Sequence, residues 1–455
     1  MSLIDRLGEI LGEDGILLGA DVRARPNHSW GRGSCPARAI LRPKSTEELS
    51  RAMALCFEHE QPVIPWGGLS GLVDGISCAK NDIAVSLERM NVIETIDTMA
   101  GTMRVQAGAI VQNIQQAAED AGWMFAVDFG ARGSAQIGGA ISTNAGGNSV
   151  VRYGMMREQI LGLEVVLADG TVCSSLNEML KNNAGYDLKQ LFIGSEGTLG
   201  IVTRAVLRLR PAPRSVQTAF LAVDRFSDLT TLLKFVATEF EGKLSAFEVM
   251  WNNHYRLLQE ISDRHREFLP SHYPFYVLLE QEGADERRSG AQFEDVLETV
   301  MKQDGVADAL VAKSHQQRKE LWAMRDDVEA IVKALDPVVV FDVSLPLRHI
   351  EEYLQTVEEQ LMVELPEARL VSFGHLGDSN VHLAVGPAND RRIVENIVYG
   401  KLADVDGSIS AEHGIGLEKR QFLAQSRSDV ELGLMRTIKG ALDPKNLLNP
   451  GKVFE

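Results

Sequence analysis

The sequence predicts an α+β fold built from two parts, each with its own sheet. Short β-rich runs follow one another through tight turns in residues 62–175, which favours mixed or antiparallel sheets over the regular strand–helix alternation of a doubly wound fold. After Arg210-Pro211-Ala212-Pro213 the glycine density falls, and amphipathic helices alternate with strands. This second pattern predicts an antiparallel sheet covered by helices. A chain of 455 residues is long enough for two or three separate cores.

The individual elements follow from local patterns. Residues 46–60 predict a helix, opened by a Ser45/Thr46 cap and an acidic first turn, and residues 110–121 predict another. Strands are predicted in the first part at PVIPW, DIAVSL, MNVIETID and GTMRVQAGA, with a D-G hairpin at ILGLEVVLADGTVC. In the second part a helix is predicted at LTTLLKFVATEF, and strands at SAFEVM, PFYVLLEQ, VVVFDVSLP, ARLVSFGHL and NVHLAVG.

Composition excludes several classes of protein. The net charge of -17 argues against a nucleic-acid partner, because phosphate binding needs an electropositive face. The start MSLIDRLGEILGED lacks the pattern of a secretory or transit leader, and no apolar run approaches the about 18 residues of a membrane span. The scattered cysteines suggest neither a disulfide framework nor a metal cluster, and they fit a reducing compartment: Cys35, Cys56, Cys78 and Cys173. We therefore predict a cytoplasmic protein.

Two regions are dense in glycine and other small residues. The run PWGGLSGL, residues 65–72, follows an apolar strand and would let backbone N–H groups approach a phosphate, although a glycine turn without a ligand explains it equally well. Residues 128–154 and 194–203 add many further Gly, Ala, Ser and Thr residues. Such density leaves backbone amides and small hydroxyls accessible, which suits a long dinucleotide lying across the protein.

The order of these motifs resembles the FAD domain of the vanillyl-alcohol oxidase superfamily, the PCMH type. The resemblance covers roughly residues 38–212 and runs through PWGGLSGL, ARGSAQIGG, TNAGG, LEVVLADG and YDLKQLFIGSEGTLGIVT. Some members bind the flavin covalently through a histidine in the first loop; Leu69 and Ser70 stand there, so we expect non-covalent FAD. Trp66 and Asp74 depart from the usual loop pattern. The FAD contacts implied by the resemblance are Pro65, Trp66, Gly67, Gly68, Leu69, Ser70, Gly71 and Leu72 at the pyrophosphate, Gly133, Ser134, Gly138, Gly139, Thr143, Asn144 and Gly147 along the cofactor, and Glu196, Gly197 and Ile201 near the adenine and ribose.

Three histidines lie in two glycine-bounded segments of the second part. Residues 371–383 predict a hairpin that would bring His375 and His382 together at its open end, and residues 407–416 add Glu412 beside His413. Two histidines and a carboxylate suit a catalytic zinc, manganese or iron site with an open position. Histidines satisfied by structural partners are the alternative.

The segments HLGDSNVH and SAEHGIGLEK resemble the D-2-hydroxyglutarate, D-lactate and glycolate dehydrogenases. The resemblance implies that His375, His382 and Glu412 hold a divalent metal and that His413 takes the hydroxyl proton as general base, while the Cα hydride goes to flavin N5. It also implies that Arg325 clamps the substrate carboxylate with two parallel hydrogen bonds. Taken alone, an arginine in such a helix would be expected on a solvated face.

Three residues depart from the D-2-hydroxyglutarate dehydrogenases. Glu329, Val340 and Ala384 stand where those enzymes carry a threonine, a lysine and an amide. An acid and an apolar residue would handle a second carboxylate poorly, because burying it without a partner costs several kcal/mol. We therefore predict a shorter or less charged substrate, most simply a monocarboxylate.

The closing segment LDPKNLLNPGK resembles the family segment that returns to the flavin domain. Asn449 would approach the isoalloxazine, although Asn-Pro-Gly is strong turn chemistry by itself. The predicted domains are a PCMH-type FAD-binding domain at 1–212, a substrate or cap domain at 213–405, and a segment at 406–455 that completes the active site and returns to the FAD domain.

Together these features predict an FAD- and metal-dependent dehydrogenase of a small D-2-hydroxy acid. The alternatives are an alcohol or sugar oxidase on the same flavin fold, or a flavin electron-transfer subunit with an idle substrate site. The expected electron acceptor is an electron-transfer flavoprotein or a quinone. No nucleic acid or membrane span is expected, and the oligomeric state stays open, with a homodimer among the options.

Overall fold

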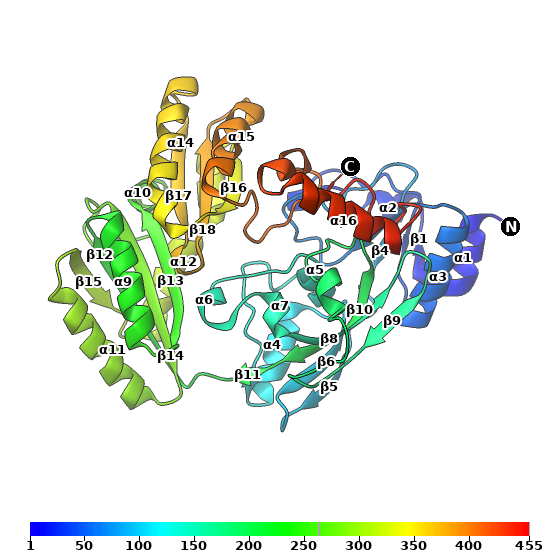
Figure 1. Ribbon diagram of the computed structural model, residues 1–455, viewed down its shortest axis with the longest axis horizontal. Helices are drawn as coiled ribbons and strands as arrows, with labels where there is room; N and C mark the ends of the chain where they lie inside the picture. Colours follow the sequence, from blue (N-terminus) through cyan, green and yellow to red (C-terminus); the bar gives the residue numbers. More distant parts are fainter. Residues whose placement is uncertain (263, 455) are drawn as a thin grey trace. The chain divides into compact units, whose positions relative to one another are not determined.

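A computed structural model describes residues 1–262 and 264–454, which form two compact units (Figure 1). The first unit contains residues 1–147, 154–212 and 412–455, and the second contains residues 148–153 and 213–411. The chain therefore enters the second unit twice and returns to the first for its last segment.

The first unit contains two main sheets and one short pair of strands. Its first sheet has the order β1 (Ile16–Leu17), β2 (Ala39–Leu41), β4 (Ile83–Ser86), β3 (Val63–Trp66), with β2 and β3 both parallel to β4. Its second sheet is antiparallel, with the order β5 (Ile93–Asp97), β6 (Thr102–Gln106), β10 (Ile201–Arg208), β8 (Ile160–Val166), β9 (Val172–Ser175). The pair consists of β7 (Trp123–Met124) and β11 (Arg210–Pro211). The predicted mixture of parallel and antiparallel pairing is confirmed.

The helices of the first unit form where the sequence supplies caps and apolar faces. Ser45 accepts a hydrogen bond from the backbone N–H of Glu48 and so opens the helix predicted at residue 46. The D-G hairpin between β8 and β9 also forms, and Gly170 takes the positive φ of 87° that this turn requires. The helices are α1 (Leu3–Leu11), α2 (Ala20–Arg23), α3 (Thr46–Glu58), α4 (Val111–Asp120), α5 (Ile137–Ser142), α7 (Met156–Gln159), α8 (Lys189–Phe192) and α16 (Asp429–Leu442).

The last segment of the chain is part of the core of the first unit. Leu448 is fully buried in the main hydrophobic cluster, and Val63 of β3 forms a parallel bridge with it. The ammonium group of Lys439 on α16 donates to the carbonyl oxygens of Thr198 at 2.8 Å and Leu448 at 2.7 Å. These contacts fix the C-terminal segment to the glycine-rich region around residue 197.

The second unit is built on one antiparallel sheet of seven strands. The strand order is β15 (Val306–Val311), β12 (Ser215–Val223), β14 (Phe275–Gly283), β13 (Leu244–Trp251), β17 (Arg369–His375), β18 (Asn380–Gly386), β16 (Val339–Ser344). The strands predicted from SAFEVM, PFYVLLEQ, VVVFDVSLP, ARLVSFGHL and NVHLAVG are all present in it. The predicted antiparallel sheet covered by helices is therefore confirmed.

Helices cover both faces of this sheet, as the left part of Figure 1 shows. One face packs against α9 (Phe226–Glu239), α11 (Glu286–Met301), α14 (Ile350–Glu364) and α15 (Arg391–Gly400). The other, which we call the inner face, packs against α10 (Asn252–Ile261), α12 (His315–Asp326) and α13 (Val328–Ala334).

A short helix from the N-terminal half also lies on the inner face. Helix α6 (Val150–Tyr153) belongs to the second unit because it packs against β13. Arg152 donates to a carboxylate oxygen of Glu282 at 3.1 Å, and the Tyr153 hydroxyl donates to the same oxygen at 2.7 Å. The prediction that all of residues 1–212 form one domain did not anticipate this exchange, because nothing local in the sequence distinguishes these six residues.

Candidate functional site

In the first unit, the two glycine-rich regions lie backbone against backbone. A Cβ added at Gly68 would come within 1.9 Å of the carbonyl oxygen of Ser134, and one at Gly67 within 3.2 Å of the Cα of Gly139. Only glycine permits such an approach. The structure thus brings together the predicted pyrophosphate loop and the predicted cofactor-lining segment.

The loop presents backbone donors. Among residues 1–262 and 264–454, no group accepts a hydrogen bond from the backbone N–H groups of residues 68–71, and the loop is partly exposed. Leu69 has a φ of 57°, in the left-handed region, which turns successive N–H groups to one side. Trp66 is buried in an apolar cluster against which Leu69 and Ile76 pack, and its indole N–H donates to the carbonyl oxygen of Ile76 at 2.8 Å. These donors and this close packing fit a dinucleotide pyrophosphate.

The other predicted cofactor residues lie in the same unit, in two groups. Gly147 approaches Asp128 so closely that an added Cβ would meet its carbonyl oxygen at 2.0 Å. The Thr143 hydroxyl donates within its own helix end, to the carbonyl oxygen of Gly139 at 3.1 Å. Asn144 accepts from the backbone N–H of Arg157 at 3.0 Å. The first group is Gly133, Ser134, Gly138, Gly139, Thr143, Asn144 and Gly147, and the second is Glu196, Gly197 and Ile201 at the start of β10.

Glu196 joins that second group to the end of the chain. Its two carboxylate oxygens accept from the backbone N–H groups of Ile415 at 2.7 Å and Gly416 at 2.8 Å, and its carbonyl oxygen accepts from the Asn449 amide at 2.8 Å. Burial raises the pKa of Glu196 above its ordinary value, although the two N–H donors oppose that shift. Asn449 Oδ1 is buried and has no hydrogen-bond partner among the residues that the structure describes. Asn449 therefore keeps an acceptor available for a ligand group.

Replacing Glu196 by glutamine is expected to weaken FAD retention. Each of the two carboxylate oxygens accepts a hydrogen bond from a backbone N–H. In glutamine an NH2 group replaces one of these oxygens, and because NH2 cannot accept, one backbone N–H would lose its partner. The expected cost is about 1–3 kcal/mol of stability in the first unit. FAD absorbance after gel filtration and the urea midpoint of the Glu196→Gln protein measure both effects. Wild-type values for both would contradict the role assigned to these hydrogen bonds.

Two of the predicted metal ligands, His375 and His382, lie on the inner face of the second unit. The hairpin of β17 and β18, joined by η4 (Leu376–Asp378), places the rings of His375 and His382 5.2 Å apart. They lie beside the turn and not at the open end, because Phe373 is the residue paired with His382. The predicted proximity of the two histidines is confirmed, and its position in the hairpin is corrected.

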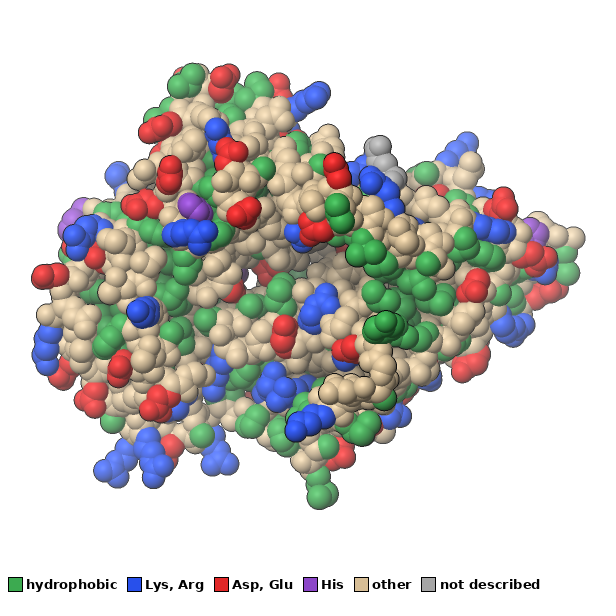
Figure 2. Space-filling view, viewed as in Figure 1, with side chains coloured by type: hydrophobic (Ala, Val, Ile, Leu, Met, Phe, Trp, Pro, Cys, Tyr) green, Lys and Arg blue, Asp and Glu red, His purple; other side chains and the backbone are tan. Residues whose placement is uncertain are grey.

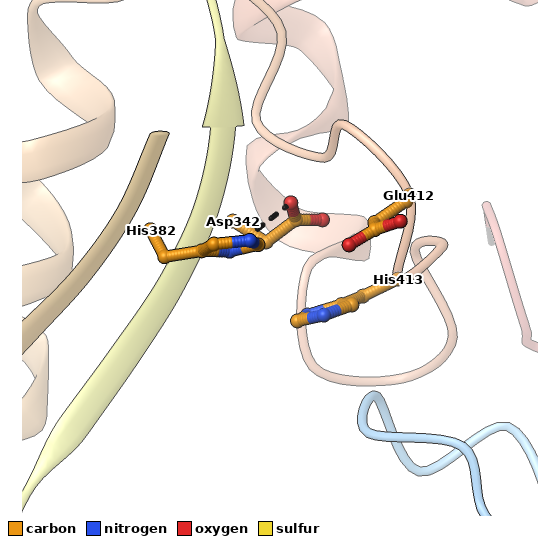
Figure 3. Close-up of side chains that lie close together, drawn as sticks. All are labelled: Asp342, His382, Glu412 and His413. Carbon is orange, nitrogen blue, oxygen red and sulfur yellow. Dashed lines mark ion pairs between the residues drawn. The ribbon is translucent and has the colours of Figure 1, made fainter. Parts of the chain in front are cut away.

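Each of these histidines faces a buried carboxylate on a neighbouring strand. His375 Nδ1 lies 2.7 Å from Glu248 Oε1, and His382 Nδ1 lies 3.9 Å from Asp342 Oδ1, a pair drawn with a dashed line in Figure 3. Glu248 is 1% exposed and Asp342 is fully buried. The 2.7 Å contact is a hydrogen bond, which fixes the His375 ring and leaves Nε2 as the nitrogen presented to a ligand, whereas the 3.9 Å between His382 and Asp342 is an ion-pair distance only.

Glu248 and Asp342 are site residues that the sequence analysis missed. Both are single acids inside otherwise apolar strand runs, SAFEVM and VVVFDVSLP. Carboxylates are almost never fully buried unless paired, so an acid in such a run is a signal of a buried partner. The sequence therefore indicated that Glu248 and Asp342 have buried partners, but it did not show which residues those partners are.

Arg325 is buried on the inner face and not solvated, which rules out the alternative considered for it. Its Nε–H donates to Glu248 Oε2 at 2.7 Å, and its NH2 group lies 3.1 Å from His375 Nε2. The guanidinium carbon lies 5.2 Å from the ring centre of Phe373. Burial alone would raise the pKa of Glu248, but the charges of His375 and Arg325 outweigh it and hold that pKa below its ordinary value.

Glu412 and His413 follow directly after a residue anchored to Asp342. The backbone N–H of Ala411 donates to a carboxylate oxygen of Asp342 at 3.1 Å. Within the first unit, Glu412 accepts from the backbone N–H of Gly147 at 3.1 Å. Consecutive Cα atoms are about 3.8 Å apart, so chain connectivity alone keeps Glu412 and His413 within one or two residue steps of that anchor. Figure 3 draws both side chains as sticks.

The three residues that depart from the hydroxyglutarate pattern do not act alike. Val340 and Ala384 are paired directly across β16 and β18, on the same face as His382, and both belong to an apolar cluster with Ile331 and Leu335. Glu329 is exposed on α13. The apolar pair, and not Glu329, therefore disfavours a second carboxylate on the substrate.

Comparison with known families decides the assignment of the chain. Residues 37–175 match the FAD binding domain, and residues 212–453 match the C-terminal domain of the FAD linked oxidases. The chain belongs to the FAD-linked oxidase family. This FAD-linked oxidase is an enzyme that oxidises a CH–OH group, and its cofactor is FAD.

Its curated relatives align along nearly the whole chain. A D-2-hydroxyglutarate dehydrogenase of Stutzerimonas stutzeri is 34% identical over 465 residues, covering 100% of this chain and 99% of the relative. The mitochondrial D-2-hydroxyglutarate dehydrogenase of Arabidopsis thaliana is 36% identical, covering 98% of this chain and 80% of the relative. A mitochondrial Schizosaccharomyces pombe protein, provisionally named a D-lactate dehydrogenase, is 34% identical, covering 97% of this chain and 88% of the relative.

Solved structures share the fold. Alkyldihydroxyacetonephosphate synthase superposes with a TM-score of 0.77 at 17% identity, covering 98% of this chain and 84% of that one. p-Cresol methylhydroxylase superposes with a TM-score of 0.77 at 15% identity, covering 99% of this chain and 96% of that one. The predicted PCMH-type fold of this FAD-linked oxidase is confirmed.

The predicted cytoplasmic location is wrong by these comparisons. The Arabidopsis, Schizosaccharomyces, zebrafish and bovine relatives are all named as mitochondrial. The prediction depended on the lack of a leader pattern in the first residues, and such a lack does not specify a compartment.

Figure 2 shows Lys and Arg side chains interspersed with Asp and Glu over the face in view.

Within residues 1–262 and 264–454, no helix combines the length and the apolar character needed to cross a membrane.

Proposed function

We propose that this FAD-linked oxidase is a divalent-metal-dependent dehydrogenase that oxidises a small D-2-hydroxy acid to the 2-oxo acid. The observation that carries the proposal is the pair of histidines on the inner face, each facing a buried carboxylate through Nδ1. At His375 this contact is a 2.7 Å hydrogen bond, the arrangement characteristic of metal-binding imidazoles, and at His382 the carboxylate lies at 3.9 Å, an ion-pair distance. The names of the relatives, D-2-hydroxyglutarate and D-lactate dehydrogenases, support the substrate class.

His375, His382 and Glu412 are the proposed metal ligands, and an imidazole–carboxylate set suits zinc, manganese or iron. The fit is better for His382 than for His375, because the Arg325 guanidinium lies 3.1 Å from His375 Nε2 and would have to shift to admit a cation there. A bound divalent cation would lower the pKa of the substrate hydroxyl as a Lewis acid.

The chain's own groups carry the remaining steps. Arg325 binds the substrate carboxylate and orients the Cα–H bond, since a planar guanidinium offers two parallel donors. His413 accepts the hydroxyl proton as general base. Bound FAD would supply the acceptor for the Cα hydride, and the backbone N–H donors of residues 68–71 would hold its pyrophosphate. An electron-transfer flavoprotein or a quinone would serve as the electron acceptor that reoxidises the enzyme.

The substrate side chain is proposed to be short or apolar. Val340 and Ala384 form part of an apolar cluster two residues from Asp342 and His382 along β16 and β18. A second carboxylate there would lose its hydration without gaining a partner, at a cost of several kcal/mol. A monocarboxylate such as D-lactate or D-2-hydroxybutyrate avoids that cost.

Anaerobic bleaching of the bound FAD tests the proposal. D-Lactate and D-2-hydroxybutyrate are expected to bleach the flavin faster than D-2-hydroxyglutarate and much faster than the L enantiomers. Treatment with EDTA is expected to abolish bleaching, and Zn²⁺ or Mn²⁺ to restore it. Unchanged bleaching after complete metal removal would exclude the metal from the reaction. Bleaching only by alcohols or sugars would favour an oxidase of the same fold, and none by any donor would favour an electron-transfer subunit.

A further inference from the structure

Glu248 contacts both of the groups that the proposed function assigns to different tasks on the inner face. One carboxylate oxygen lies 2.7 Å from His375 Nδ1, and the other accepts from Arg325 Nε–H at 2.7 Å. Glu248 sits opposite His375 in the register of β13 and β17, whereas Arg325 comes from α12. A single buried carboxylate therefore connects a residue of the sheet with a residue of the helix that covers it.

The geometry is specific to Glu248 and is not a general way of attaching α12. Another buried glutamate, Glu280 on β14, accepts from Arg318 Nε and NH2 at 2.7 Å each and from Trp322 Nε1 at 2.9 Å. Arg318 and Trp322 lie on α12 two turns and one turn before Arg325. Glu280 thus attaches the same helix to the same face but bonds to neither predicted site residue.

We propose that Glu248 is a positioning residue that sets the spacing between the carboxylate-binding Arg325 and the metal-binding His375. With one oxygen for each partner, it holds the imidazole with Nδ1 inward, and it holds the guanidinium by Nε so that NH1 and NH2 form the edge turned to other groups. The proposal rests on the proposed function of this face.

The consequence is that substrate binding and metal binding depend on one side chain that contacts neither ligand. A glutamine at this position keeps one carbonyl oxygen but turns an NH2 group toward one of the two partners. Either the imidazole or the guanidinium then loses its acceptor, whereas the shape and volume of the side chain are retained. The same exchange at Glu280 removes a comparable charge from the same helix–sheet interface and serves as the matched control.

The experiment compares Glu248→Gln and Glu280→Gln with the wild type as FAD-loaded full-length protein. Binding of Mn²⁺ alone, measured by electron paramagnetic resonance after metal depletion, is expected to weaken about 10- to 100-fold in Glu248→Gln and to change less than about twofold in Glu280→Gln. The concentration of D-lactate that gives half-maximal flavin reduction is expected to rise about 10-fold or more only in Glu248→Gln. FAD content and the thermal midpoint of the two variants should match each other.

A third measurement separates this proposal from the proposed function. Nitrogen-15 labelling of the histidines reports which imidazole nitrogen of His375 carries the proton, with His375→Gln identifying the signal. In metal-free wild type the proton is expected on Nδ1, and Glu248→Gln should disturb that signal while Glu280→Gln should not. If the wild type binds no Mn²⁺, the metal assignment fails, and this signal alone still decides the role of Glu248.

Two outcomes would overturn the proposal. One is Mn²⁺ binding, D-lactate dependence and an imidazole signal that all stay at wild-type values in Glu248→Gln. The other is equal losses in both glutamine variants, which would reduce Glu248 to a general attachment of α12. If Glu248→Gln gives no folded FAD-loaded protein, Glu248→Asp is measured in its place, because a carboxylate one methylene shorter keeps the charge but does not reach both partners.

Discussion

His413→Ala is expected to bind FAD and metal as the wild type does and to reduce its flavin with D-lactate about 10²- to 10⁴-fold more slowly. The reason is that His413 is the proposed acceptor of the hydroxyl proton, and removal of a general base typically costs a factor of this size. Anaerobic stopped-flow absorbance at the flavin band gives the rate. Metal content and FAD content of the same preparation show whether binding is retained.

His315→Ala is the control for this measurement. His315 is exposed at the first position of α12 and should leave the rate unchanged. A wild-type rate in His413→Ala would contradict the assignment of the base, and loss of the metal together with the rate would instead place His413 among the ligands.

Arg325→Met is expected to destabilise the protein by about 3–5 kcal/mol, because it removes the guanidinium from the buried carboxylate of Glu248 and leaves that carboxylate with His375 as its remaining partner. Glu248 is 1% exposed, so water cannot replace the lost hydrogen bond. Urea unfolding followed by fluorescence measures this change. The variant should also lose flavin reduction by D-lactate, since no other donor pair is assigned to the substrate carboxylate.

The double variant Arg325→Met/Glu248→Leu separates the two effects. Removing the carboxylate together with its partner replaces a buried ion pair with apolar volume, which is often neutral for stability. Most of the lost stability should therefore return, while flavin reduction should stay absent. A cost below about 1 kcal/mol in Arg325→Met would contradict the pairing, because truncation of one member of a buried pair leaves an uncompensated charge.

The glycine-rich half was open to prediction because its demands are local. The loop at residues 65–72 and the segment at residues 133–147 are rich in glycine. Only glycine leaves room for two backbones to approach as closely as they do at Gly68 and Ser134. Likewise the cap at Ser45 and the hairpin turn at Gly170 are short-range patterns. The elements formed at these places lie within a residue or two of their predicted bounds.

The inner face was harder to predict because its contacts join distant parts of the chain. Glu248 and His375 are 127 positions apart, and they meet only because β13 pairs with β17 in a strand order that departs from the sequence order. The hairpin of His375 and His382 could be predicted since its strands are consecutive. The contacts of Glu248 and Asp342 with these histidines could not be predicted, because β13 is not consecutive in the sequence with its partner β17, nor β16 with its partner β18. Helix α6 was missed for the same reason, because its partner Glu282 lies 129 positions beyond Tyr153.

The return of residues 412–455 to the first unit has a consequence for biosynthesis. During translation the ribosome completes every residue of the second unit before it supplies Lys439 and Leu448 to the core of the first. The nascent chain can therefore fold its later unit first, while the glycine-rich region around residue 197 waits for the segment that packs against it. We expect flavin capture to be a late, post-translational event, which makes the cofactor a marker of chains that have been synthesised through Leu448.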